Sequence, residues 1–113
     1  MSVLALLLAL AMGDDWPAWR GPNRDGVSAE KGLPSTWSSD KNVFWKVELP
    51  GPAGSTPIVV KDRIYLTTPD GERLLLLCIG TDGKKVWERE LAKGVKNTTN
   101  LASASPSSDG THV

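Results

Sequence analysis

Residues 74–91 read LLLLCIGTDGKKVWEREL, and this stretch decides the fold. Leu74 to Ile79 is apolar at every position, as expected of a strand that is covered on both faces. Gly80 to Lys84 has the composition of a tight turn, and Val86 to Leu91 forms the next strand. The stretch therefore predicts two neighbouring strands joined by a turn.

Two further strands are expected on its N-terminal side. Ser55 to Val60 forms one and Arg63 to Thr68 the other, with Lys61-Asp62 as their connection. Pro69-Asp70-Gly71 is a turn in which proline presets φ and glycine allows a positive φ. With the strands above, these make one four-stranded antiparallel unit over residues 53–92.

An internal repeat sets the architecture. Residues 44–49 (FWKVEL) are echoed 42 positions later by residues 86–91 (VWEREL), and residues 55–57 are echoed 49 positions later by residues 104–106. Periods of about 40 to 50 residues, with four strands in each, are typical of β-propeller blades. We therefore predict an all-β chain that is a β-propeller fragment.

The predicted propeller is incomplete in this sequence. Residues 43–49 alternate between apolar and mostly polar side chains, as a blade's outer strand does, but no first three strands precede them. We expect this segment to be the outer strand of the closing blade, whose other strands come from the far end of a longer chain. Residues 53–92 are then the first complete blade, and residues 102–113 are the start of a second, truncated blade.

The N-terminus has the pattern of an export signal. An unbroken apolar run from Val3 to Met12 is too short to span a bilayer, and Ala11-Met12-Gly13 is a small-x-small cleavage pattern. Residues 1–13 are therefore interpreted as a signal peptide, although no Lys or Arg precedes the run; the alternative is a buried helix. We expect a periplasmic or secreted protein whose residues 14–42, rich in Trp, Pro and Gly, form an extended lead-in.

Composition excludes several classes of partner. Thirteen basic and thirteen acidic side chains give a formal net charge of zero, with no charged block, so nothing indicates nucleic acid or an anionic membrane surface. No stretch after the signal is long and apolar enough to cross a membrane. Cys78 is the only cysteine, which excludes an intrachain disulfide and paired-cysteine zinc sites; we interpret it as a small buried hydrophobe.

Two motifs resemble one protein family. Residues 15–26 (DWPAWRGPNRDG) resemble the opening of exported bacterial PQQ-binding-like β-propeller repeat proteins, and residues 78–87 (CIGTDGKKVW) resemble that family's blade signature. One departure is Lys61-Asp62-Arg63, which lacks the glycine expected between a blade's first two strands. The resemblance implies a ring of about eight blades in which Trp45 and Trp87 are structural wedges between blades.

The family includes members with different activities. Some are relatives of the outer-membrane assembly lipoprotein BamB, which binds partner proteins, and others share their fold with quinoprotein dehydrogenases, which bind pyrroloquinoline quinone (PQQ) and calcium. We expect a non-enzymatic binding or assembly scaffold without a cofactor, acting on a protein or small ligand through the complete propeller. The alternative is the N-terminal part of a PQQ-dependent dehydrogenase, and a third interpretation is a small β protein that buries its apolar faces by self-association.

No catalytic or metal-binding residue is predicted. Residues 23–26 resemble part of a calcium loop, but glycines occupy the positions of its first and last carboxylates, so we interpret them as a turn. His112, the only histidine, has no nucleophile pattern beside it. Trp16, Trp19 and Arg20 form either an anchor that pins the lead-in or a recognition surface in which the arginine stacks on a ring; the anchor is the simpler interpretation.

Overall fold

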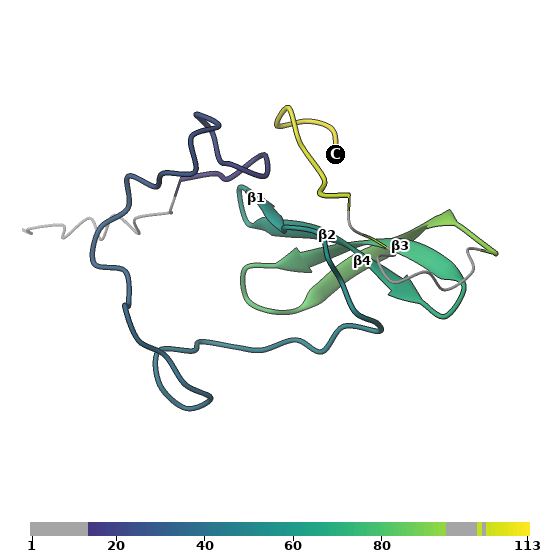
Figure 1. Ribbon diagram of the computed structural model, residues 1–113, viewed down its shortest axis with the longest axis horizontal. Coiled ribbons are helices and arrows are strands. Elements are labelled where there is room, and N and C mark those ends of the chain that lie inside the picture. The colour runs from purple at the N-terminus through teal and green to yellow at the C-terminus, as the bar shows by residue number, and fades with distance from the viewer. Residues whose placement is uncertain (1–13, 95–101, 103) are drawn as a thin grey trace, which may run out of the picture.

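The computed structural model describes residues 14–94, 102 and 104–113, and these contain one four-stranded antiparallel sheet and no helix (Figure 1). The strands follow the chain in the order β1-β2-β3-β4. Their bounds are β1 Ile58–Val60, β2 Arg63–Asp70, β3 Arg73–Gly80 and β4 Lys85–Ala92. The prediction of an all-β chain with a four-stranded antiparallel sheet is confirmed, whereas the signal-peptide prediction lies outside the described residues.

The register divides the sheet into two faces, because residues paired across antiparallel strands point to the same side. One face carries Leu66, Leu75, Leu77 and Ile79, which form the hydrophobic core cluster. Trp45 and Leu49 pack against that cluster. They follow the lead-in of residues 14–42 in the chain, and we call the side that they cover the lead-in face. The opposite side carries the cross-strand set Tyr65, Cys78 and Trp87, and we call it the tryptophan face.

β1 is shorter than the predicted strand Ser55 to Val60. Pro57 has no N–H to give to a ladder, and the Ser55 hydroxyl takes the place of a backbone partner. Its Oγ donates to the Thr67 carbonyl and accepts from the Thr67 N–H, both at 3.1 Å. Regular pairing with β2 is therefore confined to Ile58–Val60.

The β2–β3 turn lies later than predicted. Pro69 and Asp70 belong to β2, and the turn itself is Gly71-Glu72, with Gly71 at a φ of 59°. Both backbone groups of Thr67 face the β1 side, so those of Pro69, two residues on, face that side as well, beyond the end of β1. A proline is tolerated there because no ladder hydrogen bond is lost.

The β1–β2 connection is Lys61-Asp62, as predicted. No glycine is present, so Lys61 itself adopts a φ of 56°, in the left-handed region that side chains disfavour. The missing glycine does not break the hairpin, since Val60 pairs with Arg63.

Residues 43–49 form no strand in the structure, contrary to the sequence pattern. The segment contacts the lead-in face through Trp45 and Leu49 but hydrogen-bonds to no described strand, and a strand exists only where its backbone groups find a partner. Likewise no strand is assigned to residues 102 and 104–113. That these segments belong to neighbouring blades stays a prediction, because it concerns strands outside this sequence.

Candidate functional site

The described residues offer three surfaces: the two faces of the sheet and a pocket beside the lead-in. On the lead-in face, Trp45 docks on the turn between β3 and β4. Its indole Nε1 donates to the Thr81 carbonyl at 2.8 Å. Gly83 has a φ of 83°, and a Cβ placed there would lie 2.8 Å from the Trp45 ring. The turn therefore fits this tryptophan only if position 83 has no side chain.

The lead-in face remains partly open beside this contact. A groove of about 610 Å³ runs between residues 47–50 and the strands β3 and β4. Leu75, Leu77 and Ile79 line it, and charged residues such as Lys85 and Glu88 also border it. A groove that combines apolar side chains with charges of both signs is suited to packing against another segment of chain.

On the tryptophan face, Trp87 lies half-buried on the edge strand β4. Its ring is tilted at 50° to that of Tyr65, with centroids 5.9 Å apart, and 36% of the residue remains exposed. Cys78 is fully buried on this face, as predicted, and burial raises the pKa of its thiol above the ordinary value. A buried thiol held in its neutral form is a poor nucleophile, so Cys78 acts as a packing residue.

The C-terminal segment covers another part of the tryptophan face. The Thr67 hydroxyl lies 3.2 Å from the Ala102 carbonyl and 3.0 Å from that of Ala104, within donor range of both. The Thr56 N–H donates to the Ser105 Oγ at 2.9 Å. Thr56 and Ser105 occupy equivalent places in the repeated motifs at 55–57 and 104–106. Equivalent positions of the two repeated motifs are therefore hydrogen-bonded to each other.

The lead-in is anchored to β1 by Asp15 and Trp16. The N–H of Trp16 donates to the Val59 carbonyl at 2.7 Å, and its carbonyl accepts from the Val59 N–H at 2.9 Å. One residue earlier, the Asp15 carboxylate accepts the N–H of Lys61 at 2.6 Å. Trp16 thus joins the lead-in to the edge strand β1.

That Trp19 and Arg20 belong to a recognition surface stays a prediction. Trp19 is 65% exposed, and the Arg20 guanidinium donates to the Asp25 carbonyl at 3.2 Å within its own loop. No stacking of arginine on an aromatic ring occurs among residues 14–94, 102 and 104–113. Of the three residues, the structure gives a tertiary contact to Trp16 and a local one to Arg20.

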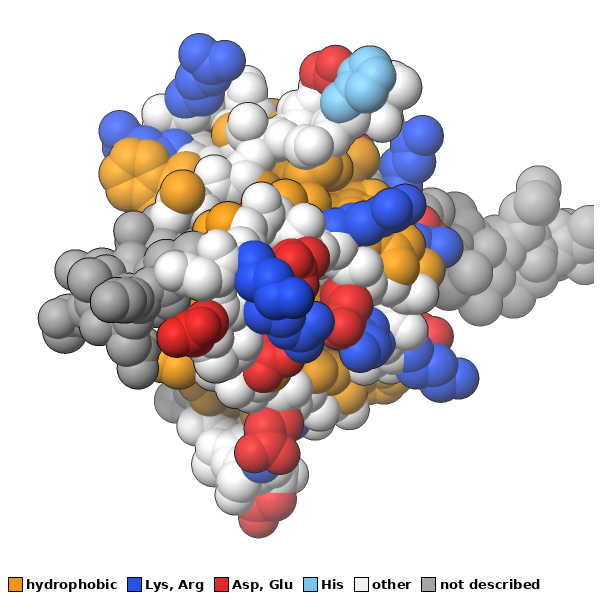
Figure 2. Space-filling view, turned by 90° about the vertical axis from the view of Figure 1, so that its right-hand side faces the viewer, with side chains coloured by type: hydrophobic (Ala, Val, Ile, Leu, Met, Phe, Trp, Pro, Cys, Tyr) orange, Lys and Arg blue, Asp and Glu red, His pale blue; other side chains and the backbone are white. Residues whose placement is uncertain are grey.

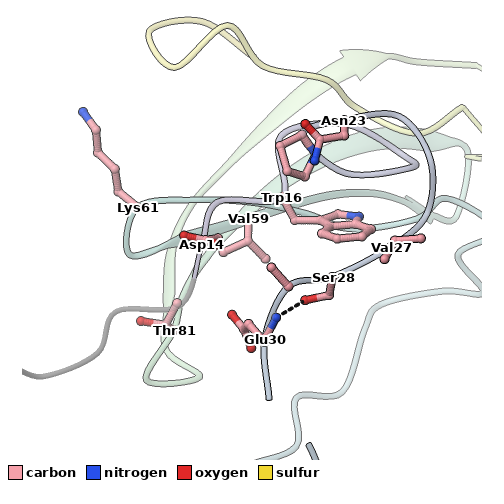
Figure 3. A pocket seen from close by; sticks show the side chains of 11 residues that line it. Asp14, Trp16, Asn23, Val27, Ser28, Glu30, Val59, Lys61 and Thr81 are labelled. Carbon is pink, nitrogen blue, oxygen red and sulfur yellow. Dashed lines mark hydrogen bonds between the residues drawn. The ribbon is translucent and has the colours of Figure 1, made fainter.

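A pocket of about 470 Å³ lies between the lead-in and the sheet (Figure 3). Trp16 and Val59 line it, together with loop residues Asn23, Ser28 and Glu30. The sequence indicates Trp16 but not the three polar residues. In the sequence each of them is an ordinary loop residue, and only the fold shows that it lies near the Trp16 ring. Their spacing shows no motif, so no sequence signal pointed to them.

Neither a metal centre nor a catalytic group is apparent in the described part of the chain. Its His, Cys, Asp and Glu side chains form no cluster of three or more that would hold a metal ion. His112 lies with Asp109 at the exposed surface, Nδ1 to Oδ2 at 3.0 Å (Figure 2). The backbone N–H and ring of His112, with the Thr111 N–H, lower the pKa of Asp109 to about 2. This arrangement is a capped turn rather than a catalytic pair.

Acidic and basic side chains are interspersed on the surface shown in Figure 2, without a large region of one sign. Arg73 pairs with Asp70 and lies 3.9 Å from Glu90, and Lys85 pairs with Glu88 at 2.9 Å. Such exposed pairs contribute little stability, but charges along an edge strand such as β4 discourage unwanted strand pairing.

No protein-family model, curated protein or solved structure matches the chain. Among the described residues there is also no helix that would span a membrane. The family resemblance therefore rests on the sequence motifs alone.

Proposed function

We propose that this chain supplies a blade of an exported β-propeller repeat protein that acts as a non-enzymatic binding or assembly scaffold. The observation that carries the proposal is the hydrogen bond between Thr56 and Ser105, at equivalent places in two repeats. In a ring of blades, each inner position lies beside its equivalent in the next blade, which is the relation these residues have.

The docking of Trp45 supports the same arrangement. Trp45 and Trp87 are equivalent in the repeat, and Trp45 sits on the turn that immediately precedes Trp87. Applied once more, the same relation would seat Trp87 on the corresponding turn of the following blade. Trp87 is half-exposed in the described structure, as expected of a wedge whose neighbour is not in this sequence.

A scaffold is favoured over an enzyme because the described side chains serve packing. Trp45 packs on the hydrophobic core cluster, Cys78 is fully buried, and Trp87 lies against Tyr65. The alternative remains the N-terminal part of a PQQ-dependent dehydrogenase. Its quinone and calcium would have to be held by other blades, since the described residues offer no carboxylate set for calcium, and no chemical step is assigned to them.

The first test is the coding DNA beyond the codon for Val113. The proposal expects the frame to continue with further blades that carry a tryptophan about every 40 to 50 residues. A stop codon at that point would contradict it and favour a small β protein that self-associates.

The full product then separates scaffold from enzyme. It is purified from the exported fraction, and dye reduction with alcohols is measured after adding quinone and calcium. If the protein is an exported scaffold, we expect no turnover, and we expect Asp14 to be the N-terminal residue after signal cleavage. Turnover that requires both additions would establish the dehydrogenase instead, and an uncleaved product retained in the cytoplasm would contradict export.

A further inference from the structure

Backbone hydrogen bonds tie parts of the chain that surround the pocket beside the lead-in. Trp16 is fixed to β1 by its two backbone bonds with Val59. The loop that forms the opposite wall is tied by bonds from Gly21 to Ala18 at 2.8 Å and from Gly26 to Arg20 at 3.0 Å. A pocket whose walls are already ordered loses little conformational entropy when a ligand enters. The Trp16 side of the site is thus held in place within the described chain.

Its lining combines an apolar floor with a polar rim. The Trp16 ring lies in the middle, with Asn23 on one side of it and Ser28 and Glu30 on the other (Figure 3). The Ser28 Oγ accepts the Glu30 N–H at 3.2 Å, so its own proton is available for a ligand. The Asn23 amide both donates and accepts, and the Glu30 carboxylate accepts.

We propose that this pocket binds a neutral saccharide. A pyranose has an apolar C–H face that stacks on an aromatic ring, and a rim of hydroxyls that both donate and accept hydrogen bonds. The pocket offers the matching ring and matching rim, and its volume of about 470 Å³ is within the ordinary range for small-ligand sites.

An organic cation is the competing ligand class, because Glu30 and Asp14 also line the pocket. Sites for quaternary ammonium groups typically surround the cation with several aromatic rings. Among the described residues that line this pocket, Trp16 supplies the only aromatic ring. The mixture of amide, hydroxyl and carboxylate around one ring favours the saccharide.

The test is saturation-transfer NMR on the full chain with methyl glycosides of glucose, galactose, mannose and N-acetylglucosamine. We expect transfer to at least one glycoside and shifts of the Trp16 indole and Val59 amide signals. Asn23→Ala and Glu30→Ala should each weaken that binding at least about fivefold, as expected from the loss of one hydrogen bond. Both residues are exposed, so neither change should disturb the sheet.

Trp37→Ala is the matched control, because Trp37 is 71% exposed and does not line the pocket. It should leave the affinity unchanged while removing one tryptophan. Absence of transfer to all four glycosides would overturn the proposal. So would binding that Asn23→Ala leaves intact, or a site that takes choline in place of the sugars. Because the pocket involves one blade and its lead-in, these results do not depend on whether the longer protein is a scaffold.

Discussion

Gly83 tests the docking of Trp45 on the turn between β3 and β4. Its φ of 83° favours glycine, and a Cβ there would lie 2.8 Å from the Trp45 ring. We expect Gly83→Ala to lower the free energy of unfolding by about 2 to 4 kcal/mol, from backbone strain and displacement of the ring together. Urea unfolding followed by circular dichroism measures this change.

Gly71→Ala is the matched control for that variant. Gly71 also has a positive φ, 59°, but a Cβ there would meet nothing within 4 Å. It should lose only the strain contribution, roughly 1 kcal/mol. Equal losses at the two positions would show that Trp45 is not docked on the turn.

Lys61 and Asp15 test how the lead-in supports a hairpin that lacks glycine. Lys61→Gly should stabilise the chain by about 0.5–1 kcal/mol, because it relieves an unfavourable φ of 56°. Asp15→Ala should destabilise it by about 1 kcal/mol, through loss of the acceptor for the Lys61 N–H. The pair is measured by urea unfolding, with Asp14→Ala as control. Destabilisation by Lys61→Gly would show that the backbone there is not strained.

Among the elements, the sequence predicts best the two strands β3 and β4, which pair with each other. β3 and β4 follow from an apolar run, a turn and an apolar-charged strand, and the structure places them within one residue of the predicted bounds. The predicted strand Ser55 to Val60 is longer than β1, because the Ser55 hydroxyl and not a backbone group bonds to Thr67. Residues 43–49 have a strand's alternation but no strand partner among residues 14–94, 102 and 104–113, and alternation alone cannot provide one.

The candidate pocket was less predictable than the sheet. Trp16 is a candidate from the sequence because a large aromatic residue in a loop is expected to contact another part of the chain. Its backbone bonds to Val59 are such a contact. Asn23, Ser28 and Glu30 reach the ring through a loop whose path depends on several local hydrogen bonds. Such a path has no periodicity, so a single sequence does not predict it.

The turn at residues 109–112 should respond to acid. The bonds from the backbone and ring of His112 and from the Thr111 N–H lower the pKa of Asp109 from 3.8 to about 2. A pKa below its unfolded value stabilises the turn above pH 3.8, and this contribution is lost as the pH falls toward about 2. An NMR titration should show the Asp109 carboxyl and the Thr111 and His112 amides changing together near pH 2. Asp109→Asn should abolish the transition, and titration of Asp109 near 3.8 would contradict the bonded turn.

At the scale of the whole molecule, the connections at one end of the sheet are linked to one another. Asp15 holds Lys61 in the β1–β2 turn, the Asp62 carbonyl accepts the Thr81 N–H, and the Thr81 carbonyl receives the Trp45 indole. These three bonds join residues 46, 19 and 36 positions apart through two turns. The sheet lies between the 43–51 segment and residues 104–113 (Figure 1), so chain on both sides begins to cover its two faces.

Trp45 and Trp87 occupy equivalent positions in the repeat, and replacing each by alanine tests how completely each face of the sheet is covered. In the 113-residue chain, Trp45→Ala should lower the free energy of unfolding by about 3 kcal/mol, because it removes a docked ring from the core. Trp87→Ala should lower it by about 1 kcal/mol, since the ring is already 36% exposed and touches chiefly Tyr65. In a longer product with a following blade, the effect of Trp87→Ala should rise to match that of Trp45→Ala, because the same turn contact would then form. Equal effects in the 113-residue chain alone would mean that Trp87 is already fully packed, and the tryptophan face would not be a surface between blades.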